Sequence, residues 1–330
     1  MEYPTMQDAA AHPATAPSPM QLRIADAYFR AIARLGQAPW RKLFDPGPRR
    51  FIERRMARRG KEPVARNVPL FFGGSMTVML PEVISEQLHG YGLFDDVVTW
   101  MALCALEPGD TVLDVGAHFG YFSLLFAALA GPQGRVFSFE PTPSTHALLA
   151  RNVAGLAGVV AINAAAGDAE GMLTIRDYGL KFSAWNTLAP DGRLGPQADG
   201  SGTTPPAQVQ VQVQTLDGLA AARGLVPGFI KIDAENYETE VLDGAAQLLR
   251  SAHPTLLLET GSPRAASLAR RLQDTGYRAF AAEAPGRLVE CPDVADAALH
   301  HKDVLYASGD RAVRLLTRAR TLGRAGHRAT

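Results

Sequence analysis

The segment from Thr111 to Glu140 constrains the fold more than any other part of the chain. It reads TVLDVGAHFGYFSLLFAALAGPQGRVFSFE: a short apolar run, a turn from Gly116 to Gly120, a helical stretch and a second β-rich run at 135–139. The helical stretch carries an apolar stripe with the spacing of a helix packed on a sheet, formed by Phe122, Leu125, Phe126 and Leu129. Gly131-Pro132 ends that helix. The pattern predicts a right-handed β-α-β unit.

The second strand of this unit ends at Glu140, in the crevice where such sheets bind ligands. A carboxylate there can accept hydrogen bonds from both hydroxyls of a ribose. The dinucleotide fingerprint G-x-G-x-x-G is absent, because His118 and Tyr121 occupy two of its glycine positions. Asp114, just before the turn, would repel a pyrophosphate and attract an ammonium, which favours S-adenosylmethionine as the cofactor. Asp114 can alternatively cap the strand end or the turn.

Two further buried strands end in acidic residues. The strand at 229–232 is followed by Asp233, and the strand at 255–258 by Glu259. Because the carboxyl ends of parallel strands meet at one edge of the sheet, we expect the active site at this edge. The pattern predicts other strands at 68–80 (with a Gly-Gly break), 159–163, 172–175, 209–214, 276–280 and 303–306. It predicts helices at 21–36 and 49–59, a helical region at 81–106, a helix from Glu238 and a long aperiodic segment at 177–208.

Several blocks of the chain resemble, in order, the motifs of the FkbM-type S-adenosylmethionine-dependent methyltransferases. The resemblance covers Gly92 to Thr260 and rests on DVGAHFGYFS at 114–123, FEPTPSTHALLARNV at 139–153, NAAAGDAEG at 163–171, VQTLDGL at 213–219, FIKIDAENYETEVLDGA at 229–245 and TLLLET at 255–260. It implies an α/β, Rossmann-like class I methyltransferase fold, with a mostly parallel central sheet, a mixed edge and an N-terminal helical cap. Two departures concern His118, where the family usually has Asn, and Ala234-Glu235-Asn236, where it usually has Val-Glu-Gly.

The resemblance also implies a cofactor site for S-adenosylmethionine. The turn and Glu140 would hold its methionine and ribose parts, and Asp168 would contact the adenine amino group. Asp168 precedes Ala-Glu-Gly, so it can equally form a turn. The predicted cofactor-binding residues are Asp114, Gly116, Ala117, His118, Gly120, Tyr121, Glu140, Pro141, Asp168 and Asp233.

Methyl transfer is an in-line displacement, and a hydroxyl acceptor must also lose its proton. The candidates for the general base are His118, Asp233, Glu235 and Glu259. A histidine has a suitable pKa near neutral pH, but one at a strand-helix turn can equally pack or cap. Asp233 and Glu235 could bind a divalent cation through oxygen ligands, but the sequence shows no further ligands, so we expect no metal.

The long aperiodic segment contains the candidate substrate-binding residues Trp185, Asn186 and Thr187. Asn186 and Thr187 resemble a small polar pair that is common in the family. Such a segment can close over an acceptor and exclude water. Alternatively, it is a solvent-exposed insertion.

Composition limits the remaining possibilities. A chain of 330 residues, 47% hydrophobic, can bury one full α/β core with an extra segment. The predicted organisation is a disordered tail at 1–20, the cap at 21–106, the methyltransferase domain at 107–308 and a basic helix or tail at 309–330. Net charge is zero, so no overall field attracts nucleic acid. Two distant cysteines, no membrane-length apolar run and no signal-peptide pattern predict a cytoplasmic protein.

Two basic runs, at 49–61 and 311–328, are typical of solvated helix faces. The second mixes leucine and valine with arginine, so it would also suit an anionic membrane surface or an anionic acceptor.

The sequence therefore predicts S-adenosylmethionine-dependent O-methylation of a small-molecule, glycan or carrier-linked acceptor: a sugar, lipid-linked or polyketide-type compound. Three alternatives remain. An NAD(P)-dependent oxidoreductase would carry the missing glycine fingerprint. A nucleic-acid methyltransferase that acts on amino groups would have an Asn/Asp-Pro-Pro-aromatic motif after the strand at 229–232. A non-catalytic cofactor-binding or scaffold protein would tolerate substitution of His118, Asp233 and Glu235.

Overall fold

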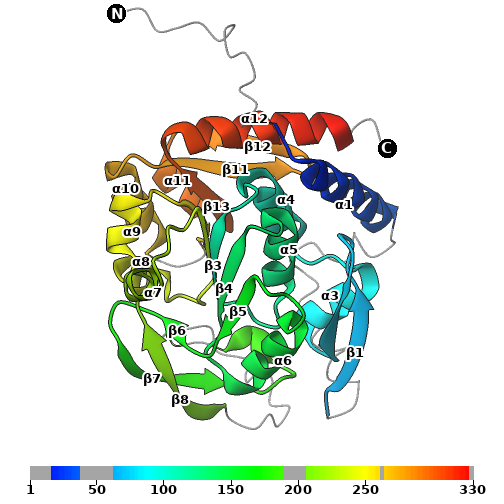
Figure 1. Ribbon diagram of the computed structural model, residues 1–330, viewed down its shortest axis with the longest axis vertical. Coiled ribbons are helices and arrows are strands. Elements are labelled where there is room, and N and C mark those ends of the chain that lie inside the picture. The colour runs from blue at the N-terminus through cyan, green and yellow to red at the C-terminus, as the bar shows by residue number, and fades with distance from the viewer. Residues whose placement is uncertain (1–15, 38–61, 187, 189–205, 261–263, 327–330) are drawn as a thin grey trace, which may run out of the picture.

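The computed structural model describes residues 16–37, 62–186, 188, 206–260 and 264–326. The basic helix predicted at 49–59 lies outside these ranges. Residues 1–15 of the predicted tail also lie outside them. Figure 1 shows the described chain as a central sheet with helices around it.

Eight strands of the described chain form the central sheet, in the order β12-β11-β13-β10-β9-β3-β4-β5. Their bounds are β3 (Thr111–Val115), β4 (Arg135–Phe139), β5 (Val159–Ile162), β9 (Phe229–Ile232), β10 (Thr255–Glu259), β11 (Arg278–Ala284), β12 (Arg287–Cys291) and β13 (Asp303–Ala307). Five neighbouring strands, β5, β4, β3, β9 and β10, run parallel. At the other edge, β13, β11 and β12 pair antiparallel. The predicted α/β fold with a mostly parallel sheet and a mixed edge is confirmed.

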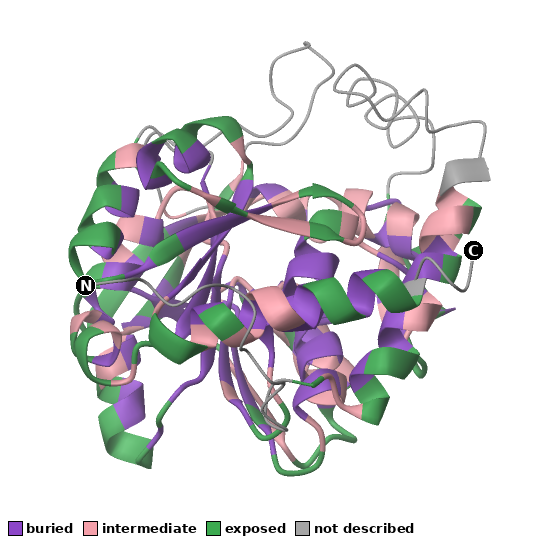
Figure 2. Ribbon diagram, turned by 90° about the horizontal axis from the view of Figure 1, so that it is seen from above, coloured by how far each residue is buried: buried purple, intermediate pink, exposed green. Residues whose placement is uncertain are grey.

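Side chains alternate between the two faces of the sheet, so consecutive strand residues enter different hydrophobic cores. Val112 packs into one core and Leu113 into the other. The first core is covered by α1 (Pro19–Gln37), α4 (Asp96–Ala105), α5 (Tyr121–Ala130) and α12 (Gly309–Gly326). The second is covered by α7 (Leu216–Arg223), α8 (Glu238–Asp243), α9 (Ala246–Ser251), α10 (Ala265–Asp274) and α11 (Val294–His300). Figure 2 shows the buried strands between these partly exposed helices.

Smaller elements complete the fold. A hairpin of β1 (Val64–Pro69) and β2 (Ser75–Leu80) precedes α3 (Val83–Tyr91). The side chain of Asn152, in α6 (Pro143–Val153), exchanges two hydrogen bonds with the backbone of Thr77 and so fixes this hairpin to the sheet domain. A three-stranded sheet contains β6 (Ala165–Ala166), β8 (Ala207–Gln214) and β7 (Gly171–Asp177), and the short 3-10 helix η3 (Ser183–Trp185) follows β7.

The helix predicted from Glu238 is two helices, α8 and α9, with a break at Gly244. At Gly244 the backbone approaches Gly167 so closely that an added Cβ would lie 1.9 Å from the carbonyl oxygen. The carboxylate of Asp217 then accepts hydrogen bonds from the first backbone N–H groups of α9, at Gln247 and Leu248. A tertiary contact and a long-range cap therefore divide the predicted helix.

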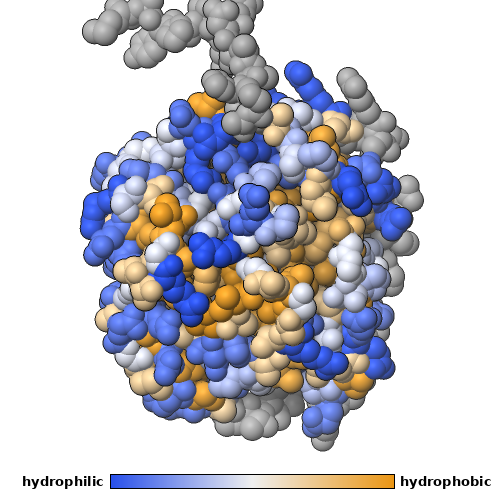
Figure 3. All heavy atoms as spheres, viewed as in Figure 1, coloured by the Kyte–Doolittle hydropathy of each residue, from blue (hydrophilic) through white to orange (hydrophobic). Residues whose placement is uncertain are grey.

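Within the described residues, the basic run is helical as far as 326 and belongs to α12, but its arginines do not all face solvent. Arg311 contacts Asp110 (3.0 Å), whereas Arg314 and Arg318 contact Glu107 (2.7 and 3.0 Å). We call these five residues the arginine cluster. Hydrophilic residues gather over the part of the surface where α12 lies (Figure 3). No helix in the described ranges is long and apolar enough to span a membrane.

Candidate active site

The site lies where the strand order reverses. From β3 the chain continues outward to β4 and β5, whereas β9 and β10 lie on the other side of β3. Such a switch point opens a crevice at the carboxyl ends of the strands. Gly116, directly after β3, has φ of 75°, and an added Cβ would lie 1.9 Å from the carbonyl oxygen of Asp233. Only glycine fits this close approach between the ends of β3 and β9.

A cavity of about 250 Å³ occupies this crevice. Its lining includes eight of the residues singled out from the sequence: Gly116, His118, Glu140, Pro141, Asn186, Asp233, Glu235 and Glu259. The structure thus brings the turn after β3, the ends of three other strands and part of the long segment to one place. Val83, Ile84 and Phe94 contribute apolar surface from α3 and the connection to α4.

Other predicted site residues lie elsewhere. Ala117 and Tyr121 line a neighbouring cavity of about 40 Å³, which His118 and Asp233 also line. Asp114, Gly120, Asp168 and Trp185 line neither of these two cavities, and Thr187 lies outside the described residues. The roles proposed for these residues stay predictions.

Glu140 is held by two backbone N–H groups. His118 donates to one carboxylate oxygen (3.1 Å) and Thr142 to the other (3.0 Å). Burial raises the pKa of Glu140 to about 7, although these hydrogen bonds act in the opposite direction. The hydroxyl of Thr142 also hydrogen-bonds to this carboxylate, so one of its four acceptor sites remains for a hydroxyl donor.

Asp114 lies behind the cavity wall. Its side chain is fully buried, and one oxygen accepts a hydrogen bond from Ser123 (2.6 Å). Burial raises the pKa of Asp114, while the nearby ammonium of Lys231 acts in the opposite direction. Asp114 therefore already has a cation near it in the protein, the ammonium of Lys231.

The sequence analysis missed Lys231. This lysine is only 3% exposed, and its ammonium lies 3.1 Å from Asp233 and 5.2 Å from the ring centre of Phe122. Burial lowers the pKa of Lys231, but Asp233 and Asp114 outweigh that effect and leave it raised. The available signal was a single charged residue within the apolar strand FIKI, since a buried lysine needs a partner.

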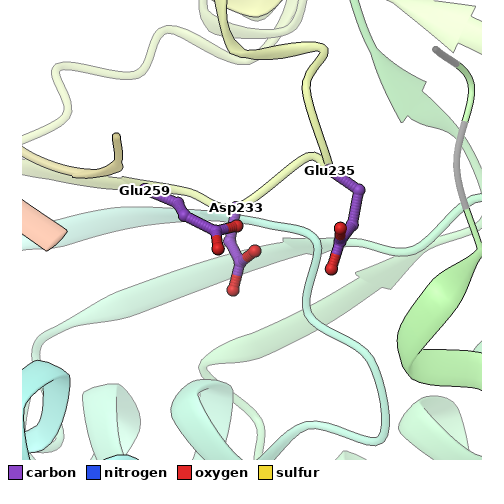
Figure 4. A group of neighbouring side chains, drawn as sticks. All are labelled: Asp233, Glu235 and Glu259. Atoms are coloured by element: carbon purple, nitrogen blue, oxygen red, sulfur yellow. The ribbon is translucent and has the colours of Figure 1, made fainter. Parts of the chain in front are cut away.

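Asp233, Glu235 and Glu259 converge in the cavity, as Figure 4 shows. Each offers a carboxylate oxygen, and these oxygens all lie within 4.8 Å of one another, a group that could in principle hold a metal ion. Two lysines already supply positive charge here, Lys231 beside Asp233 and Lys302 at 3.4 Å from Glu259. We call Lys231, Asp233, Glu259 and Lys302 the edge cluster.

The pKa values of Asp233 and Glu259 are shifted in opposite directions. Burial raises the pKa of Asp233, but Lys231 and a hydrogen bond with Glu259 outweigh it and lower the pKa to about 2. Burial and the charge of Asp233 together raise the pKa of Glu259 to about 9. Asp233 is thus the stronger acid of this pair and Glu259 the weaker one.

His118 is a neutral hydrogen-bonding group in this site. Its backbone has φ of 50°, in the left-handed region, and its ring Nε2 lies 2.7 Å from the hydroxyl of Ser183. Burial lowers the pKa of His118 to about 3. An imidazole of such low basicity is a poor general base.

The long segment reaches the cofactor side of the cavity through two residues. Besides Ser183, the amide of Asn186 donates to the hydroxyl of Thr142 (3.1 Å) and accepts from the backbone N–H of Tyr178 (2.8 Å). Ser183 and Thr142 were not among the predicted site residues. Their contacts depend on how the segment folds back onto the turn after β4, which local sequence patterns do not encode.

The geometry agrees with the results of comparison with known proteins. The methyltransferase FkbM domain model matches residues 114–279, half of the chain, and the chain belongs to this family. It is 33% identical over 162 residues to the 31-O-demethyl-FK506 methyltransferase FkbM of Streptomyces tacrolimicus, covering 42% of this chain and 60% of the relative. It is 26% identical over 156 residues to the hexuronic acid methyltransferase AglP of Haloferax volcanii, covering 44% and 54%.

The chain therefore spans less than two thirds of the length of these curated relatives. A solved structure of methyltransferase FkbM from Methylobacillus flagellatus KT aligns with a TM-score of 0.38 and 18% identity, covering 60% of this chain and 43% of that one.

Residues 114–279 thus form a methyltransferase FkbM domain, and S-adenosylmethionine is the cofactor that this family implies. The residues present fit this cofactor. Gly116 leaves open the close approach at the end of β3 that a side chain would block, and Glu140 retains acceptor capacity for a ribose. The predicted family and cofactor are thus confirmed.

Proposed function

We propose that this methyltransferase transfers a methyl group to a hydroxyl of a glycan or specialised metabolite. The observation that carries this proposal is the carboxyl group of Asp233, which lines the same cavity as Glu140 and lies 3.1 Å from the ammonium of Lys231. A hydroxyl acceptor must be oriented toward the methyl donor and must lose its proton, and a carboxylate serves both needs.

When bound, S-adenosylmethionine supplies an activated methyl group. The turn at Gly116 and His118, together with Glu140, holds the cofactor. Asp233 would accept a hydrogen bond from the acceptor hydroxyl and take its proton, while the carbon-oxygen bond that forms replaces the carbon-sulfur bond of the cofactor, which leaves as a neutral thioether. The ammonium of Lys231 favours the ionised form of Asp233 beforehand. Because Asp233 is a weak base, the proton moves late in this reaction.

The names of the relatives support two acceptor classes. One is named for 31-O-demethyl-FK506 and the other for a hexuronic acid. The cavity contains the carboxyl groups of Asp233, Glu235 and Glu259, against one lysine in its lining, Lys302. Like charges at short range would oppose an acceptor carboxylate, so we favour a neutral hydroxyl as the acceptor group.

Calorimetry with S-adenosylhomocysteine, beside NAD and NADP, tests the cofactor. Wild-type protein should bind S-adenosylhomocysteine and neither dinucleotide. Glu140→Gln should weaken that binding while still accepting one backbone hydrogen bond, whereas Glu140→Ala leaves the N–H groups of His118 and Thr142 without this acceptor. Binding of a dinucleotide alone would restore the oxidoreductase alternative.

Alkali distinguishes the acceptor group. Protein supplied with isotopically labelled S-adenosylmethionine and a panel of glycans and polyketides should give labelled products. A methyl ether on a former hydroxyl survives mild alkali, whereas a methyl ester on a former carboxylate is hydrolysed. Label that alkali releases would overturn the hydroxyl proposal. Substitution of Asp233 by Asn should abolish labelling, while a scaffold protein would show none to begin with.

We also propose a cytoplasmic location, supported by the two free cysteines, Cys104 and Cys291. Attraction of α12 to anionic membranes is a weaker proposal, because Arg311, Arg314 and Arg318 are engaged by Glu107 and Asp110. Cell fractionation tests the first. Sedimentation with phosphatidylserine vesicles tests the second, and equal sedimentation with neutral vesicles would contradict it.

A further inference from the structure

The segment from Tyr178 to Asn186 is anchored to the cofactor side of the cavity at two points. At one point the hydroxyl of Ser183 meets Nε2 of His118 at 2.7 Å. At the other, the amide of Asn186 donates to the hydroxyl of Thr142 at 3.1 Å. We call the segment 178–186 the clasped segment.

The two anchors converge on one carboxylate. The backbone N–H of His118 donates to one oxygen of Glu140, and that of Thr142 donates to the other. Glu140, which we assign to the cofactor ribose, therefore lies between the two residues that hold the clasped segment. A cofactor that fixes the position of Glu140 would therefore also fix His118 and Thr142, which carry the two anchors.

The clasped segment is built as a unit. Its ends are joined where the backbone N–H of Tyr178 donates to the side chain of Asn186 (2.8 Å). Within it, Ser183 and Trp185 are buried, and the ring of Trp185 lies 5.8 Å from that of Phe182 in an edge-to-face arrangement. Ser183 and Asn186 also line the main cavity. The segment thus forms a wall of the cavity, and the two anchors hold that wall in place.

We propose that Ser183 and Thr142 are positioning residues that clasp this wall over the bound cofactor and slow its release. The proposal rests on the cofactor site described above. Loss of either anchor leaves the clasped segment, which is otherwise a single unit, attached to the cofactor side at one point only. The two anchors should therefore act together, and removing both should cost little more than removing one.

The experiment measures S-adenosylhomocysteine affinity by calorimetry in Ser183→Ala, Thr142→Val and the double variant. Thr142→Val keeps the side-chain shape and the backbone N–H to Glu140 but removes the hydroxyl that accepts from Asn186 and also hydrogen-bonds to Glu140, so Asn186→Ala, which leaves Glu140 untouched, is measured beside it. Each single variant should weaken binding by about fivefold, the effect of one lost neutral hydrogen bond. The double variant should resemble the singles, and Thr142→Ser, which keeps the hydroxyl, should bind like the wild type.

Matched controls are Ser251→Ala in α9 and Thr317→Val in α12, whose hydroxyls bond only within their own helices. Neither should change the affinity. Thermal unfolding without ligand separates a clasp from a general loss of stability, because the clasp variants should melt like these controls.

Affinities of both single variants within about twofold of the wild type would overturn the clasp and leave the cofactor site standing. Fully additive losses would also overturn it, since the anchors would then act separately. Absence of S-adenosylhomocysteine binding by the wild type would overturn the cofactor site, and the clasp with it. If Thr142→Val fails to fold, Asn186→Ala removes the same anchor from the other side, and the same criteria apply.

Discussion

The edge cluster and the arginine cluster each contain a buried charged side chain, Lys231 and Arg318, but in different surroundings. In the edge cluster, Asp233, Glu259 and Lys302 line the main cavity, and Lys231 lies behind it. In the arginine cluster, Arg318 is 2% exposed and donates to the carbonyl of Cys104 as well as to Glu107. None of its five residues lines the main cavity.

This difference separates two uses of buried charge. The arginine cluster joins α12 to the connection between α4 and β3, so its ion pairs hold two parts of the fold together. The edge cluster shifts the pKa values of two neighbouring carboxyl groups in opposite directions beside a cavity. Strongly shifted pKa values in a cleft mark candidate functional sites, whereas ion pairs closed off from a cleft are more often structural.

The largest effect is expected for Gly116→Ala. The added Cβ would meet the carbonyl oxygen of Asp233, and φ of 75° is strained for alanine. We expect a stability loss of at least about 3 kcal/mol and no S-adenosylhomocysteine binding. Gly131→Ala is the matched control, because φ is 72° there but no atom lies within 4 Å of the added Cβ. Urea unfolding measures the stability of both variants, and calorimetry measures their S-adenosylhomocysteine binding. Equal losses of stability would show that backbone strain, and not the contact with Asp233, causes the effect.

Next is Arg318→Met, which breaks the arginine cluster without touching the edge cluster. It leaves Glu107 with one cation fewer and the carbonyl of Cys104 without its donor. We expect a loss of about 3 kcal/mol in the free energy of unfolding, with unchanged S-adenosylhomocysteine affinity at a temperature where the variant is folded. Arg320→Met, exposed on the same helix, should change neither quantity. Weakened binding in Arg318→Met would mean that the two clusters are coupled.

Glu259→Gln sharpens the comparison through pH. The folded-state pKa of Glu259 is about 9, against an ordinary value of 4.5. Its contribution to stability is thus complete below the ordinary value and is lost as pH rises toward the folded-state value. The glutamine has no proton to lose, so the variant should gain on the wild type by about 1.4 kcal/mol for each pH unit between about pH 5 and pH 9.

Urea unfolding at a series of pH values measures that gain. Glu290→Gln, which removes the partner of the exposed Arg278, serves as the control and should run parallel to the wild type. A Glu259→Gln curve parallel to the wild type would show that Glu259 is ionised in the folded protein.

The smallest effect is expected for His118→Asn. Asparagine tolerates the left-handed backbone at this position and keeps the N–H that Glu140 accepts. Loss of the ring contact with Ser183 should weaken S-adenosylhomocysteine binding by no more than about fivefold. With the pKa of His118 near 3, the variant should also leave the pH profile of methyl transfer between about pH 5 and pH 8 unchanged. A lost pH limb would identify His118 as the base after all.

Much of the fold could be predicted from the sequence because its signals are local. The apolar runs predicted the bounds of β3 and β4, and Gly131-Pro132 predicted the end of α5; all of these agree with the structure. The candidate site was predicted in part: Glu140, Asp233 and Glu259 share a cavity because parallel strands end at one edge. Lys231 was missed because its role depends on the register that pairs it with Asp114 across β9 and β3.

By itself, the sequence determined the family, the order of strands and helices and the acidic residues at the strand ends, because hydrophobic periodicity and turn residues act over short distances. Only the tertiary structure decided which charges pair. It placed Lys231 near two carboxyl groups and paired three arginines of α12 with Asp110 and Glu107. It also placed the hydroxyl of Ser183 within hydrogen-bonding distance of His118. A buried charge is stable only next to its partner, and that partner can lie anywhere in the chain.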